Sequence, residues 1–93
     1  MATIITLGGD FLESEIEIYC KRELETVGSA IAYYRKKRGL TQSKLANLAG
    51  VSRQHIGAIE SLSMSRPFSM ELFIKICYIL NIPPDEFFTL SGV

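Results

Sequence analysis

The sequence has little of what would place it outside the class of small globular proteins. It contains only seven glycines and three prolines among 93 residues, and 47% of the residues are apolar, so a largely disordered chain is excluded. No unbroken apolar run approaches the roughly 20 residues that a membrane span needs. The beginning of the sequence also lacks the basic and long apolar regions of a secretory signal. We therefore expect one small domain, or one domain with an appendage, with an efficient core.

Reactive groups are scarce as well. The two cysteines, Cys20 and Cys77, are too few for a disulfide framework, and we expect both to be core residues because they lie on apolar stripes. The single histidine, His55, has no Cys, Asp or Glu at metal-ligand spacing. No nucleophile can be matched with a base and an orienting group. These absences predict a cytoplasmic protein without metal, cofactor, small-molecule substrate or enzymatic activity.

The net charge is zero, but the charges are unevenly distributed along the chain. Residues 1–26 carry six acidic and two basic side chains, a net charge of −4. Residues 27–66 carry seven basic and one acidic side chain, a net of +6, and residues 67–93 one basic and three acidic, a net of −2. A basic centre between acidic flanks fits a local polyanion site, and it equally fits a solvated helix face.

Apolar residues recur at helical spacing from Leu12 onward, which predicts an all-α chain. Gly28 is expected to break the first run into two helices, with Thr26 as the N-cap of the second, which ends at Gly39. Three further N-caps predict helices over residues 42–49, 53 to about 61 and 70–80: Thr41, Ser52 and Ser69. A last short helix follows Pro84, and residues 3–7 are a possible edge strand or arm.

The second and third of these helices are joined by a short turn containing Gly50, which is the geometry of a helix-turn-helix. Leu45, Ala46, Leu48 and Ala49 form the expected apolar stripe of the first helix of this pair. Ile56 and Ile59 anchor the second helix, which leaves its polar N-terminal face outward. A short rigid helix of this kind fits the major groove of DNA.

The fragments Arg-Xaa-Xaa-Xaa-Gly-Leu-Thr-Gln (35–42), Leu-Ala (45–46), Gly-Val-Ser (50–52) and Ile-Xaa-Xaa-Ile-Glu (56–60) occur here at a characteristic spacing. With them the sequence resembles the Cro/lambda-repressor type of helix-turn-helix domain, the XRE-like family. The resemblance covers about residues 27–90. It implies a compact five-helix lambda-repressor-like DNA-binding domain over residues 27–90. Residues 1–26 lie outside the resemblance, and we expect them to form an acidic N-terminal extension that contains a further helix.

The resemblance also implies roles for individual residues. The base-contacting positions are Arg53, Gln54, His55 and Ala58, and the phosphate-contacting positions are Gln42, Ser52, Ser61 and Arg66. Gln42 also matches a residue that props the recognition helix. Arg35 and Glu60 match a structural ion pair between helices. The chemistry is consistent with these roles, because Arg pairs with guanine, Gln with adenine, and an Ala methyl meets the thymine methyl.

The function that follows is sequence-specific binding of double-stranded DNA by a dimeric transcriptional repressor or regulator on a pseudo-palindromic operator. We expect a homodimer built from the C-terminal helix, with Phe87 or Phe88 at the interface, and reinforced by residues 1–26. The alternative is a protein-interaction module, such as an antitoxin-like partner, that binds a second protein through residues 1–26.

Overall fold

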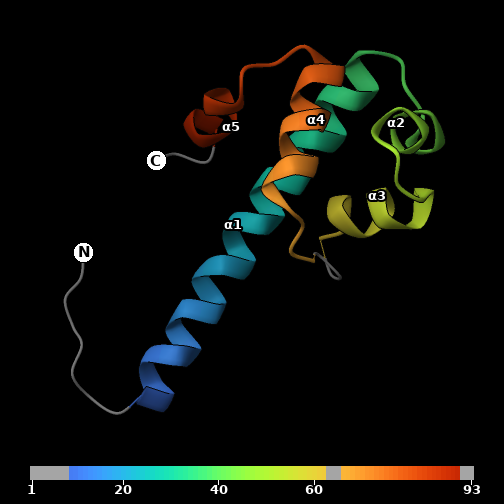
Figure 1. Cartoon of the computed structure of the whole chain (residues 1–93). Coiled ribbons are helices and arrows are strands. Elements are labelled where there is room, and N and C mark those ends of the chain that lie inside the picture. The colour runs from blue at the N-terminus through green and yellow to red at the C-terminus, as the bar shows by residue number, and fades with distance from the viewer. Residues whose placement is uncertain (1–8, 63–65, 91–93) are drawn as a thin grey trace.

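The computed structural model describes residues 9–62 and 66–90, and every regular element in these ranges is a helix (Figure 1). The helices are α1 (Gly9–Lys37), α2 (Gln42–Ala49), α3 (Arg53–Glu60), α4 (Met70–Leu80) and α5 (Pro84–Leu90). The all-α fold class is confirmed. The strand or arm expected at residues 3–7 lies outside the described residues.

Local sequence signals set the ends of the short helices as predicted. The side-chain oxygens of the three N-caps each accept a hydrogen bond from a backbone N–H of the first turn, at 3.0, 3.0 and 3.1 Å, for Thr41, Ser52 and Ser69. Two left-handed residues end α2 and α4, namely Gly50 with φ 77° and Asn81 with φ 60°. Capping satisfies backbone groups that the helices leave unpaired at their ends.

The break expected at Gly28 is wrong, because α1 continues without interruption from Gly9 to Lys37. Gly28 lies where α1 touches α3, and a Cβ atom placed on it would overlap the carbonyl oxygen of Ile59. Thr26 does not cap a helix either, since its hydroxyl donates to the Arg22 carbonyl one turn back at 3.0 Å. Gly28 therefore allows two helices to approach closely within an unbroken helix.

All five helices contribute to one core, whose members are Ile31, Leu45, Ala46, Ala49, Ile56, Ile59, Leu72, Phe73, Ile76, Cys77, Leu80, Ile82 and Phe87. The Phe87 ring packs edge-to-face against Phe73 and Tyr34, with centroids 5.3 and 5.9 Å apart. Phe87 is therefore a core residue and not an interface residue, while the side chain of Phe88 lies outside the described part of the chain. Burial raises the pKa of the Cys77 thiol from 9.0 to about 11.

Two residues predicted for the interior are on the surface. Cys20 is exposed, because the part of α1 that carries it extends beyond the other helices. Leu48 is 52% exposed, since it lies at the edge of the face of α2 that Leu45, Ala46 and Ala49 turn to the core.

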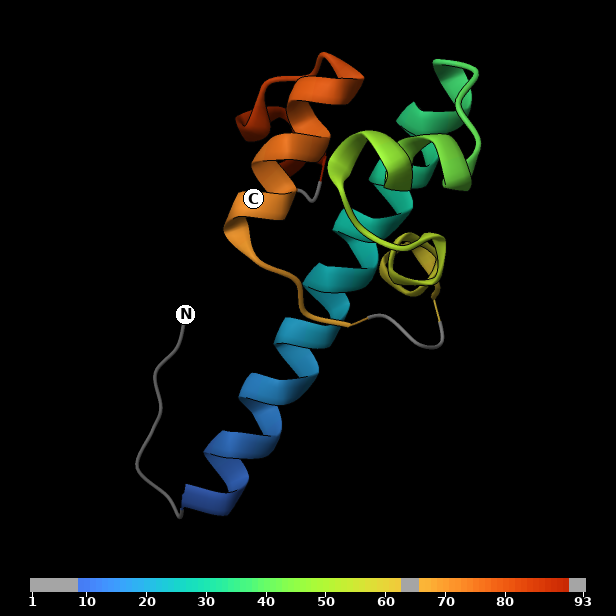
Figure 2. The same ribbon diagram turned by 45° about the vertical axis from the view of Figure 1, so that its right-hand side comes forward.

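Residues 11–22 of α1, here called the protruding segment, are all exposed. Figures 1 and 2 show this half of the helix standing clear of α2 to α5 in both views. Partial burial begins at Glu23, so the expected boundary at residue 26 falls inside a continuous helix. None of the helices in residues 9–62 and 66–90 is long and apolar enough to cross a membrane.

Candidate nucleic-acid interface

The turn between α2 and α3 fixes how α3 is presented. The backbone N–H groups of Gly50 and Val51 both reach the Ala46 carbonyl, and Gly50 also reaches that of Asn47. Ile56 and Ile59 anchor α3 in the core with at most 1% of their surface exposed. The remaining face of α3 must therefore point outward from a rigid base.

This outward face lines a shallow open hollow together with the chain that leads to α4. The lining residues are Arg53, Gln54, His55, Gly57, Ala58, Ser61, Arg66 and Pro67. The structure thus brings together all four predicted base-contacting residues and two of the four predicted phosphate-contacting residues. Arg53, Gln54 and Arg66 are exposed, and His55, Ala58 and Ser61 are half-buried.

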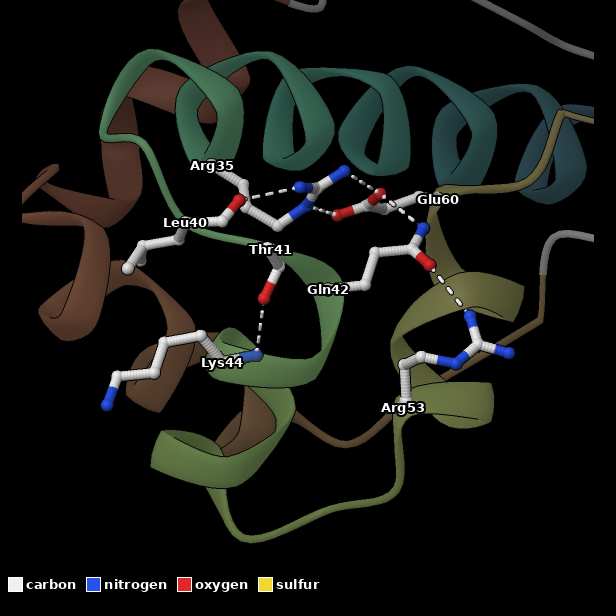
Figure 3. Close-up of polar contacts among 7 residues, drawn as sticks. All are labelled: Arg35, Leu40, Thr41, Gln42, Lys44, Arg53 and Glu60. Atoms are coloured by element: carbon white, nitrogen blue, oxygen red, sulfur yellow. Dashed lines mark hydrogen bonds and ion pairs between the residues drawn. The ribbon is translucent and has the colours of Figure 1, made fainter.

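A partly buried ion pair lies beneath this surface (Figure 3). The Arg35 guanidinium donates to both carboxylate oxygens of Glu60, at 2.7 Å from Nε and 3.0 Å from Nη2, and the two side chains are 9% and 5% exposed. Its third nitrogen, Nη1, donates to the Leu40 carbonyl at 2.7 Å. This bidentate pair joins α1 to the last residue of α3 and to the loop before α2.

Gln42 connects the ion pair to the surface. Its Nε2 donates to Glu60 Oε1 at 3.0 Å, and its Oε1 accepts from Arg53 Nη1 at 2.9 Å (Figure 3). The side chain of Gln42 therefore lies beside the hollow, where it orients Arg53. The resemblance implied that Gln42 props the recognition helix, but the sequence did not show that Arg53, 11 positions away, and Glu60 are the residues that it joins.

Ser52 occupies the N-cap of α3 and lies outside the hollow. Its hydroxyl oxygen accepts from the His55 N–H at 3.0 Å, so its first role in the fold is to begin the helix. The positive end of the α3 dipole lies at this position, beside Arg53 and Gln54.

Arg38 has a structural role that sequence reasoning missed. Its Nε donates to the Leu80 carbonyl at 2.7 Å and so ties the end of α1 to the end of α4. The sequence offered only a basic residue near a helix end, and its partner lies 42 residues away. Arg38 thus belongs to the scaffold that supports α2 and α3.

Within residues 9–62 and 66–90 no group of three His, Cys, Asp or Glu side chains is placed to hold a metal ion. The chemistry that the site offers is hydrogen bonding by guanidinium, amide and imidazole groups on the outward face of a helix that is anchored in the core. These are the groups that read base edges and neutralise phosphates.

Comparison with known proteins gives the same architecture. A family model described as helix-turn-helix matches residues 31–87. The restriction-modification controller protein C.AhdI from Aeromonas hydrophila is 31% identical, with a TM-score of 0.62, over 69% of this chain and 94% of that chain. SinR, a master regulator for biofilm formation solved in complex with DNA, is 29% identical, with a TM-score of 0.59, over 67% and 97%.

A third structure supports the fold alone. The clp gene regulator ClgR from Corynebacterium glutamicum is 23% identical, with a TM-score of 0.69, over 75% of this chain and 72% of that chain. No curated protein sequence matches the chain. The family model covers more than half of the residues, and it agrees with the fragments at 35–60 and with the geometry of α2 and α3. The chain belongs to the Cro/lambda-repressor type of helix-turn-helix family of DNA-binding regulators.

Proposed function

We propose that the chain is a sequence-specific transcriptional regulator that binds double-stranded DNA as a homodimer on a pseudo-palindromic operator. The observation that carries this proposal is the outward face of α3, whose polar side chains surround one hollow while Ile56 and Ile59 fix the helix from behind. C.AhdI is a controller protein and SinR is a regulator solved with DNA, which supports the same role here.

Arg53 and Gln54 are the proposed base-reading residues, with His55 and Ala58 beside them on α3. Both leading side chains are exposed and close to the N-terminus of the helix, which is the end that enters the major groove in this motif. The bridge from Gln42 to Arg53 limits the rotamers of the guanidinium before DNA binds. Such preorganisation reduces the entropy lost when the complex forms.

Ser52, Ser61 and Arg66 are the proposed phosphate contacts around this centre. Arg66 and Ser61 line the hollow, and Ser52 lies at the N-terminus of α3. Gln42 is proposed to add a phosphate contact to its positioning role. Contacts of this kind fix the register of a protein on the duplex without reading sequence.

The remaining parts of the proposal concern the whole protein. We place the protein in the cytoplasm, and DNA binding needs no catalytic group, metal or cofactor. Residues 27–90 are the proposed DNA-binding domain, and residues 1–26 are an extension, joined to it through the continuous helix α1, that acts in assembly. The net charge of −4 on residues 1–26 would be repelled by phosphate, so this extension is expected to face away from the DNA.

Selection of the purified full chain on random double-stranded oligonucleotides tests this function. We expect an enriched motif of two inverted half-sites with centres about 34 Å, or one helical turn, apart. The doubly substituted Arg53→Ala, Gln54→Ala protein should lose the motif, and Lys75→Ala, at an exposed position on α4, should keep it. Failure of the wild-type protein to enrich any motif would contradict the proposal.

A further inference from the structure

The face of α1 that packs in the core continues into the protruding segment without a partner. Leu12 and Ile16 precede the core-packed Ala30 and Tyr34 by 18 residues, which is five helical turns, so each pair points to the same side of α1. With Tyr19 they form an apolar stripe whose members are 45%, 52% and 60% exposed. A stripe this apolar on a monomer marks an interaction surface.

An apolar groove begins where this stripe reaches the domain. It lies between α1 and the start of α4. Its apolar lining includes Tyr19, Leu24 and Val27 from α1, and Phe68, Met70 and Phe73 from the chain at the start of α4. The stripe and the groove are therefore one continuous surface, open along the length of a helix. A second helix with a complementary apolar edge fits this shape.

The charges beside the stripe identify that second helix. Glu15 and Arg22 are seven residues apart, two turns of helix, and lie on the same edge of the stripe. If a second copy of α1 packs antiparallel, with Ile16 opposite Tyr19 of the other copy, Glu15 lies opposite Arg22 of the other copy. Two-fold symmetry makes this ion pair twice.

We infer that the protruding segments of two copies of this chain pair antiparallel along the stripe of Leu12, Ile16 and Tyr19, and that each copy places its Leu12 end at the groove of the other. A parallel pair would leave Glu15 without an opposite charge, because Cys20 would face it at the corresponding position. The antiparallel pair has a two-fold axis, so it also relates the two α3 helices in the way an inverted operator requires.

The inference deepens the proposed function, on which its link to the operator rests, by assigning the dimer interface to α1. The C-terminal helix is a weaker candidate, because Phe87 is used by the core of its own domain. Exposed Ile74 and Tyr78 on α4 form another apolar surface, but no charge pattern in the described residues beside it indicates an occupant.

The test compares two isoleucines of the same segment. Ile16 lies on the stripe, and Ile18, two residues on, points to the opposite side of the helix with a similar exposure of 56%. The wild-type mass by sedimentation equilibrium should be twice 10.4 kDa. Ile16→Glu should raise the dimer dissociation constant about a hundredfold, because both copies of a two-fold dimer lose the buried apolar contact. Ile18→Glu should raise it by less than about threefold.

Charge reversal tests the direction of the pair. Glu15→Arg and Arg22→Glu should each weaken the dimer about tenfold, and the protein with both changes should return to within about threefold of wild type. A monomeric wild-type protein would overturn the inference and leave the stripe to a different protein. Equal effects at Ile16 and Ile18, no rescue by the double reversal, or a dimer that is lost only on Tyr78→Glu would overturn it too.

Binding to a DNA duplex with one half-site separates this interface from the proposed function. Ile16→Glu should retain its circular dichroism and its affinity for the single half-site, because α3 is untouched. A dimer that binds no selected DNA would overturn the proposed function and keep the interface. A monomer that binds half-sites would overturn the interface and keep the DNA-reading role of α3.

Discussion

Arg53 is held from inside the protein through a series of side chains. Arg35 binds Glu60, Glu60 accepts from Gln42, and Gln42 accepts from Arg53, with successive distances of 2.7, 3.0 and 2.9 Å. The carboxylate of Glu60 is thus shared between a structural cation and the amide that orients a surface guanidinium. In a site of low exposure such hydrogen bonds are stronger than in water, and the loss of one member leaves others unsatisfied.

Glu60→Ala should lower the free energy of unfolding by about 3 kcal/mol, because it leaves the charge of Arg35 buried without its partner. Glu71→Ala is the matched control, since Glu71 forms an ion pair with Lys75 at 3.9 Å on an exposed face of α4. It should cost no more than about 1 kcal/mol. Urea denaturation measures both, and equal losses would show that the Arg35 pair adds nothing beyond a surface contact.

Gly28→Ala and Gly57→Ala should change stability in opposite directions. At Gly28 the new methyl group would overlap the Ile59 carbonyl and force α1 away from α3, at a cost of about 2 kcal/mol after the gain in helix propensity. At Gly57 it would lie 3.7 Å from Gln42 Oε1, an ordinary contact, so the propensity gain of about 0.5–1 kcal/mol should remain. Thermal unfolding of the two proteins tests this contrast, which two destabilised variants would refute.

The two cysteines should differ in reactivity. Cys20 is exposed, while burial raises the pKa of Cys77 to about 11, so only one thiol of the folded protein should react with a disulfide reagent near pH 8. Because the folded state keeps the Cys77 proton longer than the unfolded state does, the free energy of unfolding should fall as the pH rises from 9 to 11. Cys77→Ala should remove that part of the pH dependence. If two thiols of the native protein react rapidly with the reagent, Cys77 is not buried as described.

At the scale of the elements, α3 is short, capped and anchored, so its substitutions should act on DNA recognition rather than on the fold. Arg53→Ala or Gln54→Ala should each cost about 1–3 kcal/mol of affinity for the selected operator and relax the preference at one base pair. Arg66→Ala should instead weaken binding to operator and random DNA alike. Fluorescence titration with both duplexes distinguishes the two patterns, and an equal loss on both for Arg53→Ala would refute base reading.

Signals that lie within one turn of helix could be read from the sequence. Ser52, for example, needs only its own hydroxyl and the N–H groups that follow it to begin α3, and Gly50 needs only its own backbone freedom to end α2. Contacts between distant elements could not be read in this way. Gly28 looked like a helix break because its true cause, the Ile59 carbonyl, comes from another helix.

The candidate site was partly predictable for the same reason. The pattern from residue 35 to residue 60 was sufficient to identify the outward positions of α3 and to suggest a pairing of Arg35 with Glu60. The sequence could not indicate that Gln42 spans from Glu60 to Arg53, or that Arg38 reaches the Leu80 carbonyl, because both depend on how three segments meet. The exposure of Leu48 likewise depends on which side of α2 the remaining helices cover.

At the scale of the whole molecule, opposite charges are separated along one chain with no net charge. The basic residues of the segment 27–66 lie on α1, α2 and α3 and on the chain that follows α1 and α3, and the net charge there is +6. The charged residues of the N-terminal 26 all lie on α1 between residues 10 and 25 and sum to −4, and the protruding segment extends away from the other helices (Figure 1). This dipolar distribution favours one orientation of the protein as it approaches DNA.

Binding should therefore depend steeply on salt although the net charge is zero. The slope of log affinity against log salt concentration should be about −0.9 for each phosphate that is neutralised, and Arg66→Ala should reduce its magnitude by about that amount. Lys75→Ala, an exposed basic residue outside the segment 27–66, should leave the slope unchanged. Titrations of DNA between low and physiological salt measure this slope. An affinity that does not change with salt would argue against a DNA partner.

The continuity of α1 through Gly28 makes the length of the protruding segment as important as its composition. An unbroken helix turns by about 100° and advances about 1.5 Å with each residue, so one inserted residue before Glu23 would rotate everything on its N-terminal side relative to the domain. A loop would absorb the insertion, but a helix cannot. We therefore expect this stretch to tolerate substitution at many exposed positions while it resists insertion and deletion, except for changes near a whole number of turns, such as seven residues.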